Sequence, residues 1–476
     1  MLLKLSKFFL YLALFSVLIV LSTIFFPFIG GKYYFFRTAV SFAVVSLILW
    51  WAFEAPPGAL ALRFRKAMSY PLVVAVSAFA IAFLLACLFA HDPSAAFWSN
   101  YERGEGGFQM LHYYAFFLLL VMLFDREEDW RLAFKLSLFA AILLILYGVG
   151  AAGLYEGFLG PYAPGGQPLA PTFWSRLFSD ARFQGSLGNP AYVAPYLFFA
   201  MCYAAYLWLT SRSRKVAWVV YGLFLVVALT IFILSETRGA FIGLGVAVFA
   251  FLGYLIITSA ATRRWALPAV AAVLLLVGSL YYFRNSPLIE NVPGRRLLDL
   301  NLLQQSSAQT RLWTWGSAWQ GFLERPVLGW GPENFSAVFD KHFDPRHYVP
   351  GTNSETWFDR AHSVVFDYLA ETGILGFASY LGMFAVLYWE FYRTRRKVHP
   401  DEAAAAPPGR GHRSPMLRAL LFAVPVGYLV QGLILFDVLP IYLNLFLFLA
   451  FCTYWTEHSV LFGRRRAAGA TTNAHA

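Results

Sequence analysis

Histidine and arginine are the residue types in this chain whose placement indicates charge-dependent chemistry. His362 follows Arg360 and Ala361 at the head of a long apolar run. A histidine titrates near neutral pH, so it can remove a proton from a hydroxyl group as a general base. Four arginines accompany it: Arg103, Arg182 and Arg238 lie shortly before apolar runs, and Arg311 lies in the polar segment 283–361. Guanidinium groups suit phosphate because their planar fork donates two parallel hydrogen bonds, so these arginines predict an anionic ligand.

Each of these residues also has a structural interpretation. A histidine at the start of a membrane span often lies at the interface without further function. Arg238 could cap the short turn before Gly239, and Arg311 could extend from an amphipathic helix toward the membrane surface. Glu371 lies four residues after Asp367, so both share a helix face, and we expect them to pair with an arginine for structure.

The polar segment 283–361 must position several of these residues, because it leads directly into His362. Five tryptophans anchor it and predict that it is ordered: Trp313, Trp315, Trp319, Trp330 and Trp357. After a possible N-cap at Ser306 or Ser307, apolar residues recur at helical spacing to about Leu323. This spacing predicts an amphipathic helix that carries Arg311 and lies against the membrane or the spans.

The rest of the chain has the composition of an integral membrane protein. Only 13% of its residues are charged and 59% are hydrophobic, whereas a soluble domain has about 25% charged residues. A span needs about 20 apolar residues, and about 12 runs meet this length, which predicts an all-α polytopic fold. The runs are 8–29, 36–53, 70–90, 108–124, 132–153, 190–210, 216–234, 240–259, 266–282, 362–389, 418–437 and 440–456.

Lysine and arginine gather in alternate loops, which predicts the orientation. The positive-inside rule then places both termini in the cytoplasm and 283–361, between runs nine and ten, outside. The same rule explains most of the net charge of +11, so we expect membrane lipids and no nucleic acid as partners. We expect one membrane domain over 1–476, with a flexible loop at 391–417 and a flexible tail at 463–476.

Several sequence stretches resemble the O-antigen ligase and polymerase superfamily. They are RFQGSLGNP at 182–190, SETRGA at 235–240, Arg311 with Trp315, LGWG at 328–331 followed by Asn334-Phe335, AHSVVFDYLAETGILG at 361–376 and, more weakly, YERG at 101–104 with Gly107. The order of the stretches and the predicted topology also match. One departure is Ser363, where the family very often has asparagine.

The resemblance implies a membrane glycosyltransferase of the GT-C-like, all-helical type, in the bacterial inner membrane with a periplasmic active site. It implies en bloc transfer of a glycan from undecaprenyl diphosphate to an acceptor hydroxyl, on lipid A-core or a similar acceptor, with inversion. His362 would be the base, the four arginines would bind the diphosphate, and Asn189, Asn334 and Glu371 would support the site. We expect no metal and no cofactor, since no Asp-x-Asp pair stands out in the outer loops.

Other functions share these features. A polysaccharide polymerase or a protein O-oligosaccharyltransferase of the same superfamily would differ in the acceptor, which the sequence does not reveal. A transporter or flippase for the lipid-linked glycan is a different class, and twelve spans would suit it. Against it, no paired Gly/Pro-broken spans occur at matching positions in two halves.

Overall fold

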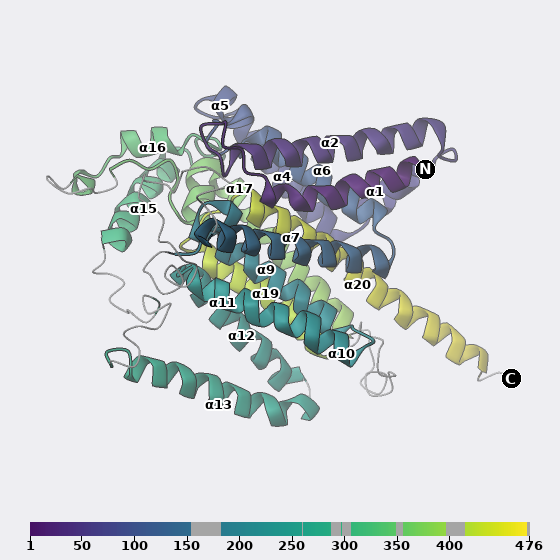
Figure 1. Cartoon of the computed structure of the whole chain (residues 1–476). Helices are drawn as coiled ribbons and strands as arrows, with labels where there is room; N and C mark the ends of the chain where they lie inside the picture. Colours follow the sequence, from purple (N-terminus) through teal and green to yellow (C-terminus); the bar gives the residue numbers. More distant parts are fainter. Residues whose placement is uncertain are drawn as a thin grey trace.

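The computed structural model describes residues 1–153, 182–258, 260–286, 297, 306–348, 356–396 and 415–473, and these residues form helices and no strands. The long helices run side by side in a bundle (Figure 1). The helices α15 (Ser306–Glu324) and α16 (Phe335–Lys341) lie at one end of this bundle, and both chain termini lie toward the other. The predicted all-α polytopic membrane fold is confirmed.

Ten described helices are long and apolar enough to cross a membrane. They are α2 (Gly30–Phe53), α4 (Pro71–Leu88), α7 (Glu127–Gly153), α9 (Pro190–Leu209), the continuous helix Arg214–Leu234, α12 (Arg238–Thr258), α13 (Ala260–Tyr282), α17 (Val364–Arg396), α19 (Pro415–Gly432) and α20 (Leu439–Asn473). A further predicted run is the shorter apolar helix α6 (Gly107–Leu123). The number of spans above ten therefore stays a prediction.

The first predicted run, 8–29, differs from the helix that forms. Helix α1 (Leu2–Ala13) begins earlier and continues only through the 3-10 turn η1 (Leu14–Leu18). Residues 19–29 form turns before α2 begins at Gly30. Pro27 explains part of the difference, because proline donates no backbone hydrogen bond and disrupts a helix interior.

The amphipathic helix predicted after Ser306 is α15, and it packs on α17. The ring of Trp315 stacks on Phe366 with centroids 5.1 Å apart. A separate small core lies beneath α15 and α16: Ala318, Trp330, Phe335, Val338, Phe339, Phe358, Ala361 and Ala370. The described part of 283–361 is therefore a folded cap on the bundle.

Helix α17 is broken at Gly373, whose φ of 62° is left-handed. The turn 326–331 supplies the hydrogen-bond partners that the break would leave without pairing. Trp330 and Gly331 donate to the carbonyls of Ala370 and Glu371 (2.9 and 2.8 Å), while the amides of residues 374 and 375 donate to the carbonyls of residues 326 and 327 (2.8 and 3.2 Å). The break thereby holds the cap on the end of the bundle.

The predicted flexible segments are described only in part. Helix α17 continues to Arg396 and α19 begins at Pro415, so 397–414 lies outside the described residues. Helix α20 extends to Asn473, and 474–476 lies outside them as well. The domain limits and the flexibility of both segments stay predictions.

Candidate functional site

His362 stands in a short segment that three other parts of the chain hold in place. The amide of Ala361 donates to Asp367 Oδ1 at 2.7 Å, and its carbonyl accepts from Trp315 Nε1 at 2.9 Å. The amide of Val364 donates to the carbonyl of Leu435 at 3.0 Å. Between these anchors His362 adopts a left-handed backbone with φ of 59°, which is uncommon for a residue other than glycine. The cap, helix α17 and the connection between α19 and α20 together therefore fix the backbone position of His362.

The imidazole of His362 is half-buried between two aromatic rings. Its centroid lies 5.5 Å from that of Phe358 and 5.0 Å from that of Phe436. Nδ1 lies 3.0 Å from the carbonyl oxygen of Arg360. A carbonyl only accepts, so Nδ1 carries the hydrogen and Nε2 is left as the basic nitrogen of the neutral ring.

Burial is the largest cause that lowers the pKa of His362, from 6.5 to about 4. The hydrogen bond to the Arg360 carbonyl opposes this shift, and the positive charges of Arg311 and Arg103 lower the pKa further. The imidazole is therefore neutral at pH 7, in the form that can accept a proton. The two cations that act on it also mark the place where an anion would be attracted.

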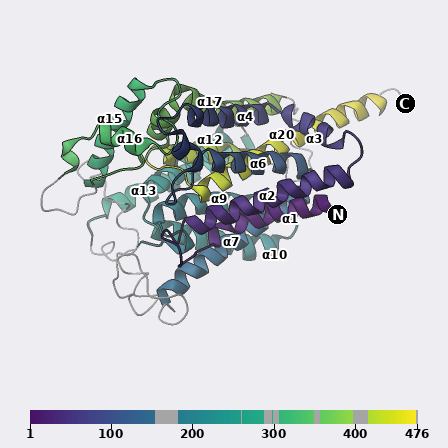
Figure 2. The same cartoon turned by 90° about the horizontal axis from the view of Figure 1, so that it is seen from above.

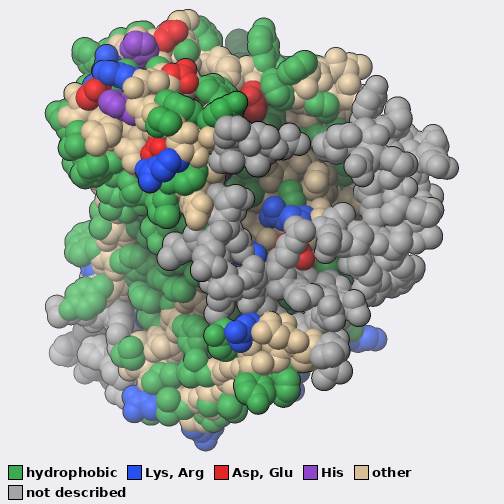
Figure 3. Space-filling view, turned by 90° about the vertical axis from the view of Figure 1, so that its left-hand side faces the viewer, with side chains coloured by type: hydrophobic (Ala, Val, Ile, Leu, Met, Phe, Trp, Pro, Cys, Tyr) green, Lys and Arg blue, Asp and Glu red, His purple; other side chains and the backbone are tan. Residues whose placement is uncertain are grey.

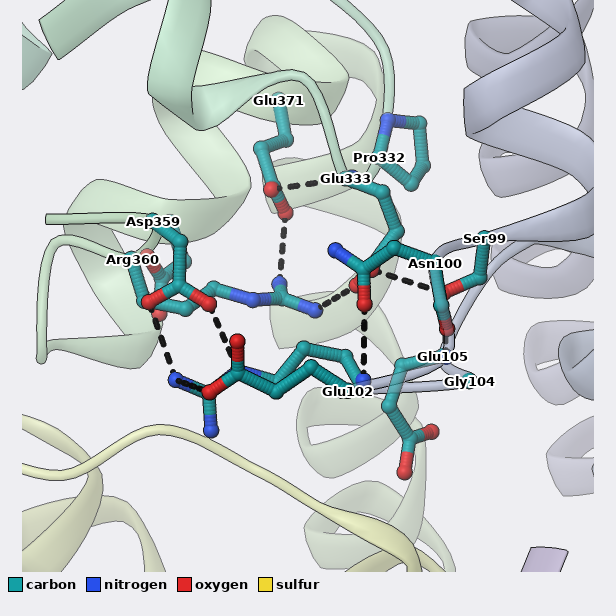
Figure 4. Close-up of polar contacts among 12 residues, drawn as sticks. Ser99, Asn100, Glu102, Gly104, Glu105, Pro332, Glu333, Asp359, Arg360 and Glu371 are labelled. Atoms are coloured by element: carbon teal, nitrogen blue, oxygen red, sulfur yellow. Dashed lines mark hydrogen bonds and ion pairs between the residues drawn. The ribbon is translucent and has the colours of Figure 1, made fainter. Parts of the chain in front are cut away.

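Arg103 is held beside His362 by Asp359. Its Nε and Nη2 donate to the two carboxylate oxygens at 2.7 and 2.9 Å, and Nη1 donates to Tyr192 Oη at 3.0 Å. Figure 4 shows Asp359 on the segment that leads to Arg360. Burial opposes ionisation of Asp359, but the hydrogen bond and charge of Arg103 keep its pKa below 3.8. The predicted ligand-binding arginine is thus already paired with a carboxylate.

Arg360 forms a buried cluster with two glutamates (Figure 4). It donates from Nη1 to Glu371 Oε2 at 2.9 Å and from Nη2 to Glu333. The side chains of Arg360, Glu333 and Glu371 are only 10%, 2% and 4% exposed. Ser99 Oγ donates to the other oxygen of Glu333 at 2.7 Å, which ties the cap to the segment before α6. The prediction of a pair with an arginine is confirmed for Glu371, whereas the carboxylate of Asp367 accepts a hydrogen bond from the Ala361 amide.

Arg311 and Arg238 approach the same region from two helices. Arg311 lies on α15 one turn before Trp315, the residue that bonds to the Ala361 carbonyl, and its charge acts on His362. Arg238 is the first residue of α12, and the next residue, Gly239, lies against Ile434 and Leu435. Because Phe436 contacts His362, the connection 433–438 brings the start of α12 toward that histidine.

Arg182 has a different environment from the other three arginines. Its Nε donates to the carbonyl of Ser235 at 2.9 Å and its Nη2 to Thr237 Oγ1 at 3.1 Å. Thr237 in turn donates to the carbonyl of Pro190 at 3.0 Å. These bonds fix the turn that precedes Arg238, so the contacts of Arg182 are those of a residue that positions another.

The two predicted supporting asparagines both act on the backbone. Asn189 is the N-cap of α9, and its Oδ1 accepts from the amide of Ala191 at 2.8 Å. Asn334 Oδ1 accepts from the amide of Asp92 at 3.0 Å, and its Nδ2 donates to the carbonyl of Asp92 at 3.2 Å. Asn334 therefore joins the cap to the start of the short helix α5 (Pro93–Trp98).

Backbone strain gathers around these residues. The described residues other than glycine that have positive φ are Ser99, Glu236, Glu333 and His362. Ser99 and Glu333 belong to the buried cluster, and Glu236 lies in the turn before Arg238. Strained residues of this kind concentrate at functional sites. Figure 3 looks onto this end of the molecule and shows basic side chains in a hollow of the surface.

Sequence reasoning missed the acidic partners, Asp359 and Glu333. Asp359 directly precedes Arg360, which was a signal in the sequence, but its partner Arg103 is 256 residues away. Glu333 follows a Gly-Pro turn and carried no signal of its own. Phe436, which contacts both His362 and Arg103, could not be distinguished from other apolar residues near a span.

Comparison with known families finds a match within this chain. Residues 223–381 match the family model Wzy_C, described as O-antigen ligase. The matched part contains Arg238, Arg311 and His362, whereas Arg103 and Arg182 lie before it. The comparison with curated proteins gives no match.

Proposed function

We propose that this chain moves a glycan from undecaprenyl diphosphate to an acceptor hydroxyl. The match of residues 223–381 to the O-antigen ligase family model supports the superfamily that the sequence predicts. Members of the family are membrane glycosyltransferase-like enzymes. We place the reaction at the end of the bundle that carries α15 and α16, on the periplasmic face of a bacterial inner membrane. The acceptor is lipid A-core or a similar glycan or lipid.

His362 is the general base of this reaction, and the contact of its Nδ1 with the Arg360 carbonyl is the observation that carries the proposal. With Nδ1 bonded to the Arg360 carbonyl, Nε2 accepts the proton of the acceptor hydroxyl. The acceptor oxygen forms a bond to the anomeric carbon while the bond from that carbon to the diphosphate oxygen breaks. The diphosphate leaves with the electron pair, so a single displacement inverts the anomeric centre.

Arg311, Arg238 and Arg103 stabilise the charge that develops on the leaving diphosphate. The donor also affects the base. Burial lowers the pKa of His362 most, and the positive charges of Arg311 and Arg103 lower it further. A bound diphosphate offsets their charge and raises that pKa, so His362 becomes a stronger base when the donor is in place.

The Arg360 cluster acts as a positioning device in this proposal. The guanidinium is held by Glu333 and Glu371, while the backbone carbonyl of the same residue holds His362 Nδ1. Asp359 holds Arg103 from the neighbouring position in the chain. One short segment thereby sets the base and one of the cations relative to each other.

A transfer assay tests the proposal. The protein in nanodiscs is incubated with a polyprenyl-diphosphate glycan, with and without candidate lipid acceptors, and products are resolved by gel and mass spectrometry. A single shift onto an added acceptor supports a ligase, and a ladder from donor alone would identify a polymerase. If the donor crossed a vesicle bilayer and no covalent product formed, the result would reject the glycosyltransferase proposal and support a transporter. We expect transfer to continue in excess chelator.

His362→Ala is the decisive variant in this assay. We expect it to lower transfer by about 10²–10⁴-fold, the usual contribution of a general base, with donor binding retained. His342→Ala is the matched control, because His342 ends α16 and its Nε2 lies 3.2 Å from Glu324 Oε1. Full activity of His362→Ala would remove the base assignment.

A further inference from the structure

A charged cavity lies where α3 (Ala59–Met68), the end of α6 and α20 meet, away from the site described above. It has a volume of about 120 Å³, room for a polar group larger than a few waters. Figure 2 shows α3 beside α20, at the end of the bundle opposite α15. This is the end that the distribution of lysine and arginine predicts to be cytoplasmic.

Two cations and two anions line this cavity. Arg63 and Lys66 lie three residues apart on α3 and so share one of its faces, and Asp125 and Glu457 line the other walls. Lys66 Nζ lies 3.1 Å from Glu457 Oε1, and Arg63 Nη1 donates to the carbonyl of Met122 at 2.9 Å. The balance of charge matters, because a ligand that carries only negative charge would face two carboxylates as well as the two cations.

Helix α3 has the character of a helix at a membrane interface. Leu62 is 70% exposed and Phe64 47% exposed, whereas Arg63 and Lys66 line the cavity. Short helices that combine basic and exposed apolar side chains lie at the boundary between headgroups and acyl chains. A lipid headgroup in the cavity would therefore have its acyl chains beside exposed apolar side chains.

We propose that this cavity binds the headgroup of a zwitterionic aminophospholipid, whose phosphate and primary ammonium match the two pairs of charges. Arg63 and Lys66 take the phosphate, and Asp125 and Glu457 take the ammonium. A purely anionic headgroup satisfies only the first pair, and a choline headgroup offers no N–H donor to the second. The site is independent of the transfer reaction, and its occupant anchors α3, α6 and α20 to the membrane.

Native mass spectrometry of lipid retention tests this proposal. The protein is purified with equal amounts of phosphatidylethanolamine, phosphatidylglycerol and phosphatidylcholine, and the ratio of retained lipids is measured on the monodisperse fraction. We expect phosphatidylethanolamine to be enriched in the wild type. Arg63→Gln with Lys66→Gln should lower its retention by about tenfold, if each lost ion pair contributes roughly 0.7 kcal/mol.

Further variants distinguish recognition of a zwitterionic headgroup from a general attraction of anionic lipids to basic residues. Asp125→Asn with Glu457→Gln should shift retention toward phosphatidylglycerol, because the carboxylates that disfavour an anionic lipid are gone. Arg65→Gln is the matched control, since Arg65 lies on the same helix, is exposed and does not line the cavity. Because each ratio is measured within one folded sample, a variant that yields little protein still gives an answer.

Three results would overturn the proposal. Equal retention of the three lipids by the wild type would exclude headgroup selection. If Arg65→Gln lowered retention as much as Arg63→Gln with Lys66→Gln does, surface charge alone would account for the effect. Displacement of the retained lipid by an equimolar amount of soluble phosphoethanolamine would mean that the site takes the free phosphate compound and not the lipid.

Discussion

At the scale of single residues, the site combines a neutral histidine with arginines that are constrained by other groups. His362 is kept neutral by burial and by nearby cations, and its tautomer is set by the Arg360 carbonyl. Arg103 is paired with Asp359, and Arg360 with two glutamates. The chemistry proposed for this site therefore depends on side chains whose charges are balanced before a substrate binds.

The pKa of His362 predicts the pH dependence of the reaction. Because this pKa is lowered to about 4, the base stays neutral as the pH falls through 6.5, and kcat/KM should decline only as the pH approaches 4. Arg311→Gln removes one of the cations that lower the pKa, so the decline should begin at a higher pH. Steady-state rates measured between pH 4 and 8 show where this decline begins in the wild type and in Arg311→Gln. A wild-type decline centred at pH 6.5 would contradict the assignment.

The Arg360 cluster predicts a large effect on stability. Arg360→Gln leaves the carboxylates of Glu333 and Glu371 buried without their cation, which should lower the free energy of unfolding by about 3–5 kcal/mol. Thermal unfolding in detergent measures this change. Arg346→Gln is the control, because its pair with Asp344 is exposed and its loss should change little. Equal melting temperatures for the two variants would show that the buried cluster contributes no special stability.

At the scale of elements, the break in α17 joins the cap to the bundle. The turn 326–331 fills the hydrogen-bond positions that the break opens, and Gly329 lies so close that an added Cβ would meet the carbonyl oxygen of Glu371 at 2.6 Å. Glu371 also belongs to the Arg360 cluster. A change in this turn should therefore affect His362, because Glu371 binds Arg360 and the carbonyl of Arg360 contacts the imidazole.

Substitution of Gly373 tests this connection. Gly373→Ala places a Cβ 2.5 Å from the backbone of Val327 and requires a left-handed alanine, so we expect a loss of about 2–5 kcal/mol in unfolding free energy together with lower transfer activity. Gly382→Ala lies on the same helix, where an added Cβ meets nothing within 4 Å. It should be neutral or stabilise by up to about 1 kcal/mol. Equal melting temperatures for the two variants would contradict this account of the break.

At the scale of the whole molecule, the functional residues and the lipid cavity lie at opposite ends of the bundle. The cap with α15 and α16 covers one end of the bundle (Figure 1), and α3 lies toward the other end, where both termini lie (Figure 2). Positive-inside reasoning predicts that these ends face opposite compartments. The orientation decides which pool of substrates reaches His362.

Site-directed labelling tests the orientation. Lys341→Cys on α16 and Arg65→Cys on α3 replace exposed residues at the two ends, whereas the native Cys87, Cys202 and Cys452 are buried. A membrane-impermeant maleimide added to intact spheroplasts should modify Lys341→Cys and leave Arg65→Cys unmodified until the membrane is opened. Modification of both from outside, or of Arg65→Cys alone, would reject the predicted topology.

The sequence by itself determined what depends on local composition and spacing. Apolar runs predict spans because the membrane interior requires apolar side chains and internally paired backbones. Helical spacing after Ser306 predicts α15, and the stretches around Arg238, Arg311 and His362 predict the family whose model matches residues 223–381. The first run was displaced, since hydropathy alone does not register that the first helix stops at Leu18 and the next begins only at Gly30, after Pro27.

Only the tertiary structure decided how the functional residues are paired. The partner of Arg103 is Asp359, 256 residues away, and the cation for Glu333 is Arg360, 27 residues away. Arg182 proved to hold the turn before Arg238, although its sequence position resembled that of the other arginines. Such pairings arise from the packing of distant segments, and packing depends on the whole set of helices. For the same reason, no local sequence pattern predicts the break of α17 or the left-handed backbone of His362.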